Sequence, residues 1–266
     1  MSPSTSLTQV TFTGLPGIPH VQPGDDLATL VCDGLDRAGL TLEPGDIVIV
    51  TSKLVSKAEG RFVDLRTVQP SARARRVAEI VRKDPRIVEL ILRESTAISR
   101  MRQDVLIVRH RLGFTLANAG IDHSNVGRDS DDWVLLLPED PDRSAALIRQ
   151  RLAELTGVAP GVVISDSHGR PFRLGTVGVA IGLAGFPALW DKRGQRDLYG
   201  RELRITVTGL GDELAAAAGL ITGQGDEGLP VVLVRGLRVP AGEGRAADLV
   251  RPEALDLYAD HQEACD

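Results

Sequence analysis

Hydrophobic residues recur along the chain with two spacings, and the two alternate. Short β-branched runs are typical of interior strands, and they lie at 46–51, 105–110, 133–137, 162–165, 177–181, 203–207 and 231–234. Longer stretches with an apolar residue every three or four positions predict helices. They span 27–39, 72–83 and 143–157, after the capping residues Asp26, Ser71 and Asp142, and also 85–92 and 211–222. The pattern predicts a mixed α/β fold.

The domain organisation follows from length and linker composition. A chain of 266 residues is long enough for one large domain or two closely connected lobes. No Pro-, Gly- or Ser-rich linker interrupts the chain before residue 238, which predicts one folded unit over residues 1–238. Residues 239–266 are rich in Ala, Glu, Asp and Arg, so we expect a peripheral C-terminal segment.

Composition and charge exclude several classes of function. No apolar run approaches the roughly 20 residues that span a bilayer, and the first dozen residues lack the features of a secretory signal. A net charge of -5 and only 3% aromatic residues argue against binding to a nucleic acid. Cys32 and Cys265 provide neither a disulfide framework nor a Cys-rich metal site. We expect a cytoplasmic protein.

Two polar segments follow predicted strands and carry candidate chemistry. In residues 51–60, Ser52, Lys53 and Lys57 have the donors that hold phosphate oxygens; the alternative is a solvated loop with surface lysines. In residues 116–126, Asp122 and Asn125 have hard oxygens suited to Mg²⁺ or Mn²⁺. Asp and Asn also occupy ordinary turns, and this segment alone slightly favours that alternative.

Two further segments add carboxylates, arginines and glycines. Asp166 and Ser167 follow the strand predicted at 162–165 and precede Arg170 and Arg173, a combination that favours a metal and anion site over a capped turn. Residues 222–228 form a Gly-rich loop, which is weak evidence by itself because turns use the same residues. The sequence contains neither a Walker A motif nor a Rossmann fingerprint.

Taken together and in order, these motifs resemble the coenzyme F420:L-glutamate ligase family, including the N-terminal ligase domain of the actinobacterial bifunctional F420 biosynthesis protein. The resemblance covers residues 14–236. It rests on GLPGIP at 14–19 with PGDD at 23–26, LVSKAEGR at 54–61, ANAGIDHSNV at 117–126, LLPEDPDRSA at 136–145, ISDSHGRPFRLG at 164–175 and ITGQGDEGLPVVLVRG at 221–236. Six motifs in one order are far more specific than any one of them.

The resemblance implies a family-specific mixed α/β fold, a homodimer, GTP as co-substrate, and two Mg²⁺ or Mn²⁺ ions, with K⁺ as a further candidate. It implies that Asp122 and Asp166 hold one metal, with Ser167 and Gln224 near the second. The GTP contacts that it implies are Leu15, Pro16, Gly17, Ile18, Ser52, Lys57, Asn125, Gly223, Gln224, Gly225, Asp226, Glu227 and Gly228. His168 and Thr176 depart from the residues expected at their positions, which puts local substrate contacts in doubt.

The hypothesis that follows is a ligase that joins L-glutamate to the F420 precursor, or its dehydro form, through an acyl phosphate, with further γ-linked glutamates as an option. Lys57, Asp122, Asp166 and Arg170 are the candidate catalytic residues, and Arg170 and Arg173 are candidates for binding substrate carboxylates or phosphate. One alternative is the same scaffold glutamylating another acid, such as a folate. Another is a sensor that binds GTP and metal without catalysis.

Overall fold

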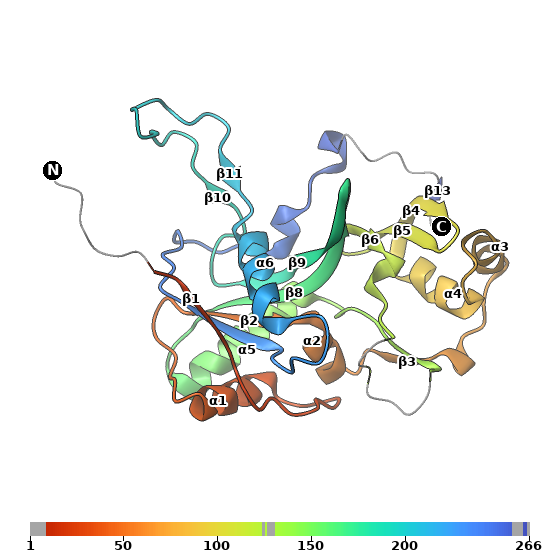
Figure 1. Ribbon diagram of the computed structural model, residues 1–266, viewed down its shortest axis with the longest axis horizontal. Helices are drawn as coiled ribbons and strands as arrows, with labels where there is room; N and C mark the ends of the chain where they lie inside the picture. Colours follow the sequence, from red (N-terminus) through yellow and green to blue (C-terminus); the bar gives the residue numbers. More distant parts are fainter. Residues whose placement is uncertain (1–8, 124–125, 127–130, 257–262, 265–266) are drawn as a thin grey trace.

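The computed structural model describes residues 9–123, 126, 131–256 and 263–264, and it has the mixed α/β fold that the sequence predicts (Figure 1). Its largest sheet has the strand order β1-β12-β2-β8-β9. These strands are Thr11–Gly14, Val231–Arg235, Ile47–Thr51, Gly161–Arg170 and Arg173–Ala184. Only β2 and β8 pair in parallel, so these two strands end at the same edge of the sheet.

Helices cover both faces of this sheet. Side chains alternate along a strand, so Val48 and Val50 of β2 face a core formed with α1 (Leu27–Arg37) and α5 (Pro141–Thr156). Ile47 and Ile49 face the opposite core, which is formed with α6 (Leu210–Thr222). Both faces are therefore buried, which explains why β2 is a continuous apolar run.

A second lobe lies beside the large sheet (Figure 1). Its four-stranded sheet has the order β13-β4-β5-β6, and α3 and α4 pack on it through a core that includes Val77, Ile91 and Leu106. These elements are Glu263–Ala264, Ser95–Arg102, Val105–His110, Thr115–Ala117, Ala72–Val81 and Pro85–Arg93. Two short strands, β3 (Phe62–Asp64) and β7 (Trp133–Leu135), pair nearby.

Short helices complete the described residues. The α-helix α2 (Ser52–Ala58) follows β2 directly. The 3-10 helices are η1 (Leu65–Thr67), η2 (Asn118–Gly120), η3 (Ala246–Leu249) and η4 (Glu253–Leu255). In this part of the chain, no helix is both long and apolar enough to cross a bilayer. Ala246 is buried against the large sheet, so residues 246–249 pack on the body; the boundary predicted at residue 238 stays a prediction.

An arm formed by β10 (Trp190–Asp191), β11 (Val207–Thr208) and the residues between them leaves the body (Figure 1). The predicted interior strand at 203–207 is wrong, because only Val207 of that run is in a strand. Ile205 is 90% exposed, and Leu198 and Tyr199 are 99% and 95% exposed. The alternating pattern was genuine, but it lies on a segment that has no core to face.

One predicted helix cap is also wrong. Asp140, not Asp142, caps α5, because Pro141 takes the first helical position and the Asp140 side chain accepts from the Arg143 amide. The Asp142 carboxylate instead accepts from the amides of Leu183 (2.9 Å) and Ala246 (2.7 Å), which ties α5 to β9 and η3. The helix predicted from residue 211 begins at Leu210.

Candidate active site

The strand register brings distant segments to one edge of the large sheet. Thr51 at the end of β2 pairs with Ser165 of β8, which places α2 next to the second half of β8. The Thr51 amide donates to the carbonyl of Pro230, so the loop before β12 also reaches this edge. The Leu15 amide donates to the carbonyl of Val231, which brings residues 15–18 there as well. The predicted motifs therefore converge because of the pairing of the strands.

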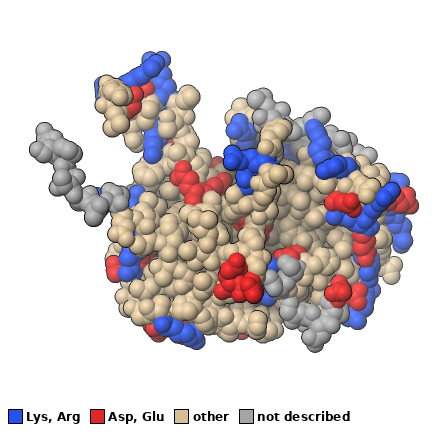
Figure 2. Space-filling view, in the orientation of Figure 1, with Lys and Arg blue, Asp and Glu red and all other residues tan. Residues whose placement is uncertain are grey.

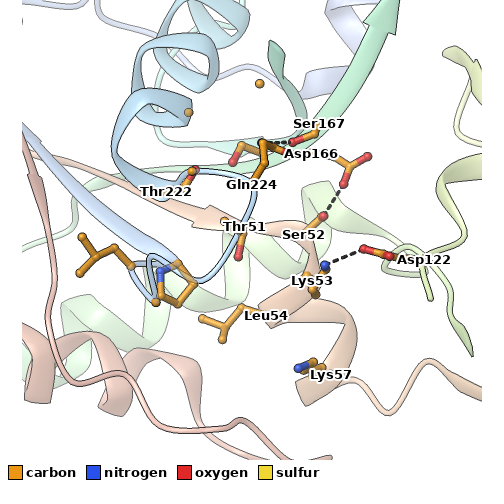
Figure 3. Close-up of a pocket in the computed structure, with 18 of the residues that line it drawn as sticks. Thr51, Ser52, Lys53, Leu54, Lys57, Asp122, Asp166, Ser167, Thr222 and Gln224 are labelled. Atoms are coloured by element: carbon orange, nitrogen blue, oxygen red, sulfur yellow. Dashed lines mark hydrogen bonds and ion pairs between the residues drawn. The ribbon is translucent and has the colours of Figure 1, made fainter. Parts of the chain in front are cut away.

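A cavity of about 750 Å³ opens at this edge (Figure 3). Both lobes contribute to it, the large sheet through α2, β8, β9 and α6, and the second lobe through residues 117–122. The predicted site residues that line it are Ile18, Ser52, Lys57, Asp122, Asp166, Ser167, Gly223, Gln224, Gly225, Asp226 and Gly228. His20, Lys53, Thr176 and Thr222 also line it.

Some predicted contacts lie elsewhere. Leu15 is fully buried in the core. Three others, Pro16, Gly17 and Glu227, do not line the cavity. The carbonyl of Gly17 accepts a hydrogen bond from Arg37 Nη1 (2.8 Å). Glu227 folds back on its own loop and accepts from the Gly225 amide (2.8 Å). Backbone amides, its own and that of Gly225, lower the pKa of Glu227. Asn125 lies outside the described residues.

Asp166 projects from β8 toward the start of α2. Its Oδ1 accepts a hydrogen bond from the hydroxyl of Ser52 (2.6 Å), and Ser52 is only 5% exposed (Figure 3). The strand predicted at 162–165 continues to Arg170, so Asp166 and Ser167 lie within β8 rather than beyond its end. A strand interior holds a side chain more firmly than a loop does, so Asp166 is a pre-positioned acid.

His168 lies behind Asp166 and is 5% exposed. Its Nε2 is 3.0 Å from Asp166 Oδ2, although within the described residues this nitrogen makes no hydrogen bond of favourable geometry. The ring packs against Phe114, which stacks on His110. The pattern of residues in the sequence gave no signal for this contact, because Phe114 and His110 come from the other lobe.

Asp122 enters the cavity from the second lobe on a strained segment. Asn118 and Ala119 have positive φ values of 53° and 52°, which are unfavourable for residues with a Cβ. Asp122 then forms a β-bridge with Leu135 through both backbone groups. Its Oδ2 is 2.6 Å from Lys53 Nζ, so an ion pair joins the two lobes across the cavity (Figure 3).

Lys57 lies one turn after Lys53 on the same face of α2. Burial lowers the pKa of Lys57, the neighbouring charge of Lys53 lowers it further, and Asp122 raises it. A partly buried ammonium beside another cation is stabilised by an anion. The solvated-loop interpretation of residues 51–60 does not fit, since these residues form a helix that lines the cavity.

The Gly-rich loop meets β8 on the opposite wall. Gln224 Nε2 donates to the hydroxyl of Ser167 (2.7 Å), as Figure 3 shows. Gly223 ends α6 with φ of 62°, and a Cβ there would lie 1.9 Å from Cδ of Glu227. Glycine is therefore favoured at Gly223, because its backbone angle is one that residues with a Cβ rarely adopt, and a Cβ would also displace the Glu227 carboxylate.

The donor set suits a hard divalent cation. Asp122, Asp166, Ser167 and Gln224 offer oxygen atoms, and Mg²⁺ and Mn²⁺ prefer oxygen ligands. Among the described residues no three His, Cys, Asp or Glu side chains form a metal cluster. Such a sparse set fits a cation that takes one or two carboxylates from the protein and its other ligands from water and phosphate.

Arg170 is not in this cavity. It lies at the tip of the β8–β9 hairpin and lines a second, smaller cavity, while Arg173 is exposed on the opposite strand. Arg170 Nη1 is 3.4 Å from the carbonyl of Gly175, a long contact that closes the hairpin. The structure thus brings Asp122, Asp166 and Lys57 together and separates both arginines from them.

Fold and site together define a mixed α/β protein whose two lobes share a pocket of carboxylates, lysines and hydroxyls, an arrangement typical of enzymes that act on anionic substrates. The chain belongs to the F420-0:Gamma-glutamyl ligase family, whose model matches residues 17–236. This match includes every residue that lines the large cavity.

Curated relatives of the chain carry the name coenzyme F420:L-glutamate ligase. The Methanopyrus kandleri protein is 49% identical over 242 residues, which cover 90% of this chain and 93% of that protein. The Methanothermobacter thermautotrophicus protein is 46% identical over 253 residues, or 94% of this chain and 98% of that protein. The Archaeoglobus fulgidus protein is 44% identical over 241 residues, or 91% and 93%.

Proposed function

We propose that this protein joins L-glutamate to the carboxylate of the F420 precursor, with GTP as the energy source and Mg²⁺ or Mn²⁺ as the cation, in the cytoplasm. The single observation that carries the proposal is the convergence of Asp122, Asp166, Ser52, Lys53 and Lys57 on one cavity from both lobes. The choice of substrates rests on the relatives, which are named coenzyme F420:L-glutamate ligase.

The chemistry requires an activated acid, because a free carboxylate is a poor acyl donor. A carboxylate oxygen of the precursor attacks the γ-phosphorus of GTP, and the bond to the β-phosphate oxygen breaks to release GDP. The glutamate nitrogen then attacks the carbonyl carbon of the acyl phosphate, the phosphate leaves with the C–O electron pair, and the nitrogen loses a proton. The net change is one amide formed and one GTP converted to GDP and phosphate.

The residues of the chain supply position and charge. Lys53 and Lys57 neutralise phosphate oxygens, and the fixed strand and β-bridge hold Asp166 and Asp122 at the reacting end. Asp122 and Asp166 would hold a divalent cation, with Ser167 and Gln224 near a second, and such ions neutralise charge on transferring phosphates. A cavity of about 750 Å³ lies in the range of sites that bind ligands of nucleotide size.

The testing experiment mixes purified protein, GTP, Mn²⁺ or Mg²⁺, L-glutamate and either the F420 precursor or a folate. Mass spectrometry should detect the precursor carrying one or more added glutamates, together with GDP in proportion. If only the folate were glutamylated, the acid substrate would be a folate instead of the F420 precursor, and the proposed ligation reaction would stand. GTP binding without product from either acid would support the sensor instead.

We also propose a homodimer, supported by the arm of residues 190–208. Leu198, Tyr199 and Ile205 are each at least 90% exposed on this arm, and exposed apolar groups of this kind mark interaction surfaces. Sedimentation should give twice the mass of one chain. Replacing the three residues with Ser should then yield monomers, whereas an unchanged mass would remove the arm from the interface.

A further inference from the structure

The second cavity, of about 340 Å³, lies beside the first. The same four elements line both: β6 or its flanking residues, β8, β9 and α6. On α6 the second cavity has Asp212 and the first has Ala215, one helical turn later. On β8, Asp166 lines the first and His168 the second, with 3.0 Å between their side chains. The two cavities are therefore neighbours along one groove.

The second cavity carries charges of both signs. Arg109 of β5 and Arg170 of β8 line it from the two lobes, and Asp212 lines it from α6. Arg251 and Asp256, near the end of the chain, add one further charge of each sign. Asp140 and Asp142 also line it, but backbone amides already occupy their carboxylates. This combination fits a small zwitterion better than a purely anionic ligand, because guanidinium groups bind carboxylates and a carboxylate binds an ammonium group.

Asp212 is the acid best placed for an ammonium group. Its Oδ1 accepts from the Ala180 amide (2.9 Å), and within the described residues Oδ2 has no hydrogen-bonding partner. Burial raises the pKa of Asp212, partly offset by the Ala180 amide and the nearby His168. A cationic ligand would compensate a carboxylate in this position.

His168 lies at the boundary between the two cavities. His168 is only 5% exposed. Within the described residues, its Nε2 makes no hydrogen bond of favourable geometry. Buried polar atoms almost always have a partner, from the protein, water or a ligand. Asp166 Oδ2, 3.0 Å away, is the group that this nitrogen faces, so His168 joins the acid of the first cavity to the lining of the second.

We propose that the second cavity binds the acceptor amino acid, with Arg109 and Arg170 at its two carboxylates and Asp212 at its amino group. This inference rests on the proposed function. Asp212 and His168 lie toward the first cavity, so the amino group faces the place where the acid is activated, and the carboxylates extend toward the hairpin tip. A cavity of this volume accepts an amino acid and leaves the larger first cavity to the nucleotide.

The test compares steady-state kinetics of Arg170→Gln and Asp212→Asn with the unaltered protein, varying L-glutamate and GTP separately. Each variant should raise the KM for L-glutamate by about tenfold or more, and leave the KM for GTP within about twofold. Arg102→Gln is the matched control, because it removes the same charge from an exposed position on β4, outside both cavities, and should change neither constant.

Substrate discrimination separates a binding role from a loss of folding. Replacing L-glutamate by L-glutamine removes one carboxylate charge, so Arg170→Gln should narrow the preference for glutamate over glutamine by about tenfold. A misfolded variant would lose turnover with both amino acids equally. Equal changes in the KM for GTP and for L-glutamate, or no change in either, would overturn the assignment.

Equilibrium dialysis of radiolabelled L-glutamate separates this inference from the proposed function. If the unaltered protein glutamylates no acid, the proposed ligase activity fails, but the dialysis still applies. Binding that Arg170→Gln and Asp212→Asn weaken at least tenfold, and Arg102→Gln does not, would support the amino-acid site alone. Absence of binding to a protein that also makes no product would overturn both.

Discussion

Two clusters of charged and polar side chains in this protein contain similar residues but differ in role, one facing a cavity and the other paired within the fold. The first, which we call the open cluster, consists of Ser52, Lys53, Asp122 and Asp166 around the large cavity. The second, the closed cluster, consists of Glu94, Arg61, Arg111 and His110 between α4, β5 and the segment before β3. On the face drawn in Figure 2, Lys and Arg side chains gather on the arm and on the second lobe.

In the closed cluster the carboxylate of Glu94 is paired within the protein. Glu94 is 13% exposed and accepts from Arg61 Nη2 (3.1 Å) and Arg111 Nε (3.0 Å), with His110 Nε2 at 3.6 Å. Burial would raise the pKa of Glu94, but the His110 contact and the charges of Arg111 and Arg61 lower it to about 2. Arg61 also donates to the carbonyl of Leu137 (2.9 Å), next to the paired strands β3 and β7.

The open cluster leaves its charges facing a cavity. Asp166 meets a hydroxyl and a histidine, and the Lys53–Asp122 pair has side-chain exposures of 30% and 34%. A buried, fully paired carboxylate serves stability, whereas a held but accessible carboxylate can bind a ligand. The comparison predicts that substitutions in the two clusters separate activity from stability.

The largest effect is expected at Asp166. Asp166→Asn keeps the size of the side chain and removes the charge that would hold a cation, so turnover should fall by about 100- to 1,000-fold. The melting temperature should change by only a few degrees. Asp36→Asn, the same change on an exposed position of α1, is the control. Near-normal rates at saturating metal would remove Asp166 from the metal ligands.

The next effect is expected at Glu94. Glu94→Gln removes the negative charge and leaves Arg61 and Arg111 without their counter-ion, so the free energy of unfolding should fall by about 3 kcal/mol. Urea denaturation measures this loss. At temperatures where the variant is folded, its KM for GTP should equal that of the unaltered protein. A large rise in the KM for GTP with an unchanged free energy of unfolding would contradict the assignment of the closed cluster to stability.

The closed cluster should also make stability depend on pH. Because the folded pKa of Glu94 is about 2 and its ordinary value is 4.5, its contribution is complete above pH 4.5 and is lost as pH falls toward 2. The stability difference between the unaltered protein and Glu94→Gln should shrink by about 1 to 2 kcal/mol from pH 6 to pH 3. A constant difference would contradict the low pKa.

A smaller effect is expected at Lys57. Lys57→Met keeps the length of the side chain and removes the charge, so the KM for GTP should rise by about tenfold. The matched control is Lys83→Met, which lies after α3 and outside both cavities. If both substitutions left the KM for GTP unchanged, the lysines of α2 would not contact the phosphates.

Most of the architecture could be predicted from local patterns. The apolar run of β2 and the caps at Asp26 and Ser71 depend on neighbouring residues, and the structure confirms these elements. The arm strand at 203–207 failed because an alternating pattern does not reveal whether a core lies beside it. The α5 cap failed because Asp140 and Asp142 flank Pro141 with equally suitable side chains.

The candidate site was predicted in part. Motif order placed Asp122, Asp166 and Lys57 in one site, and the structure brings them to one cavity. Sequence alone could not show that Lys53 pairs with Asp122, since that contact depends on how the lobes pack. The contact of His168 with Asp166 depends instead on β8 continuing through both residues, which places them on one face of the strand. The separation of Arg170 from Asp166 likewise depends on β8 continuing as a strand.

The most direct test of the open cluster is a crystal structure with GDP and Mn²⁺, using anomalous scattering to locate the metal. The account predicts a manganese ion with carboxylate oxygens of both Asp122 and Asp166 within about 2.5 Å, and phosphates next to Lys57. A manganese ion away from both carboxylates, with phosphates outside the cavity of α2 and β8, would contradict it.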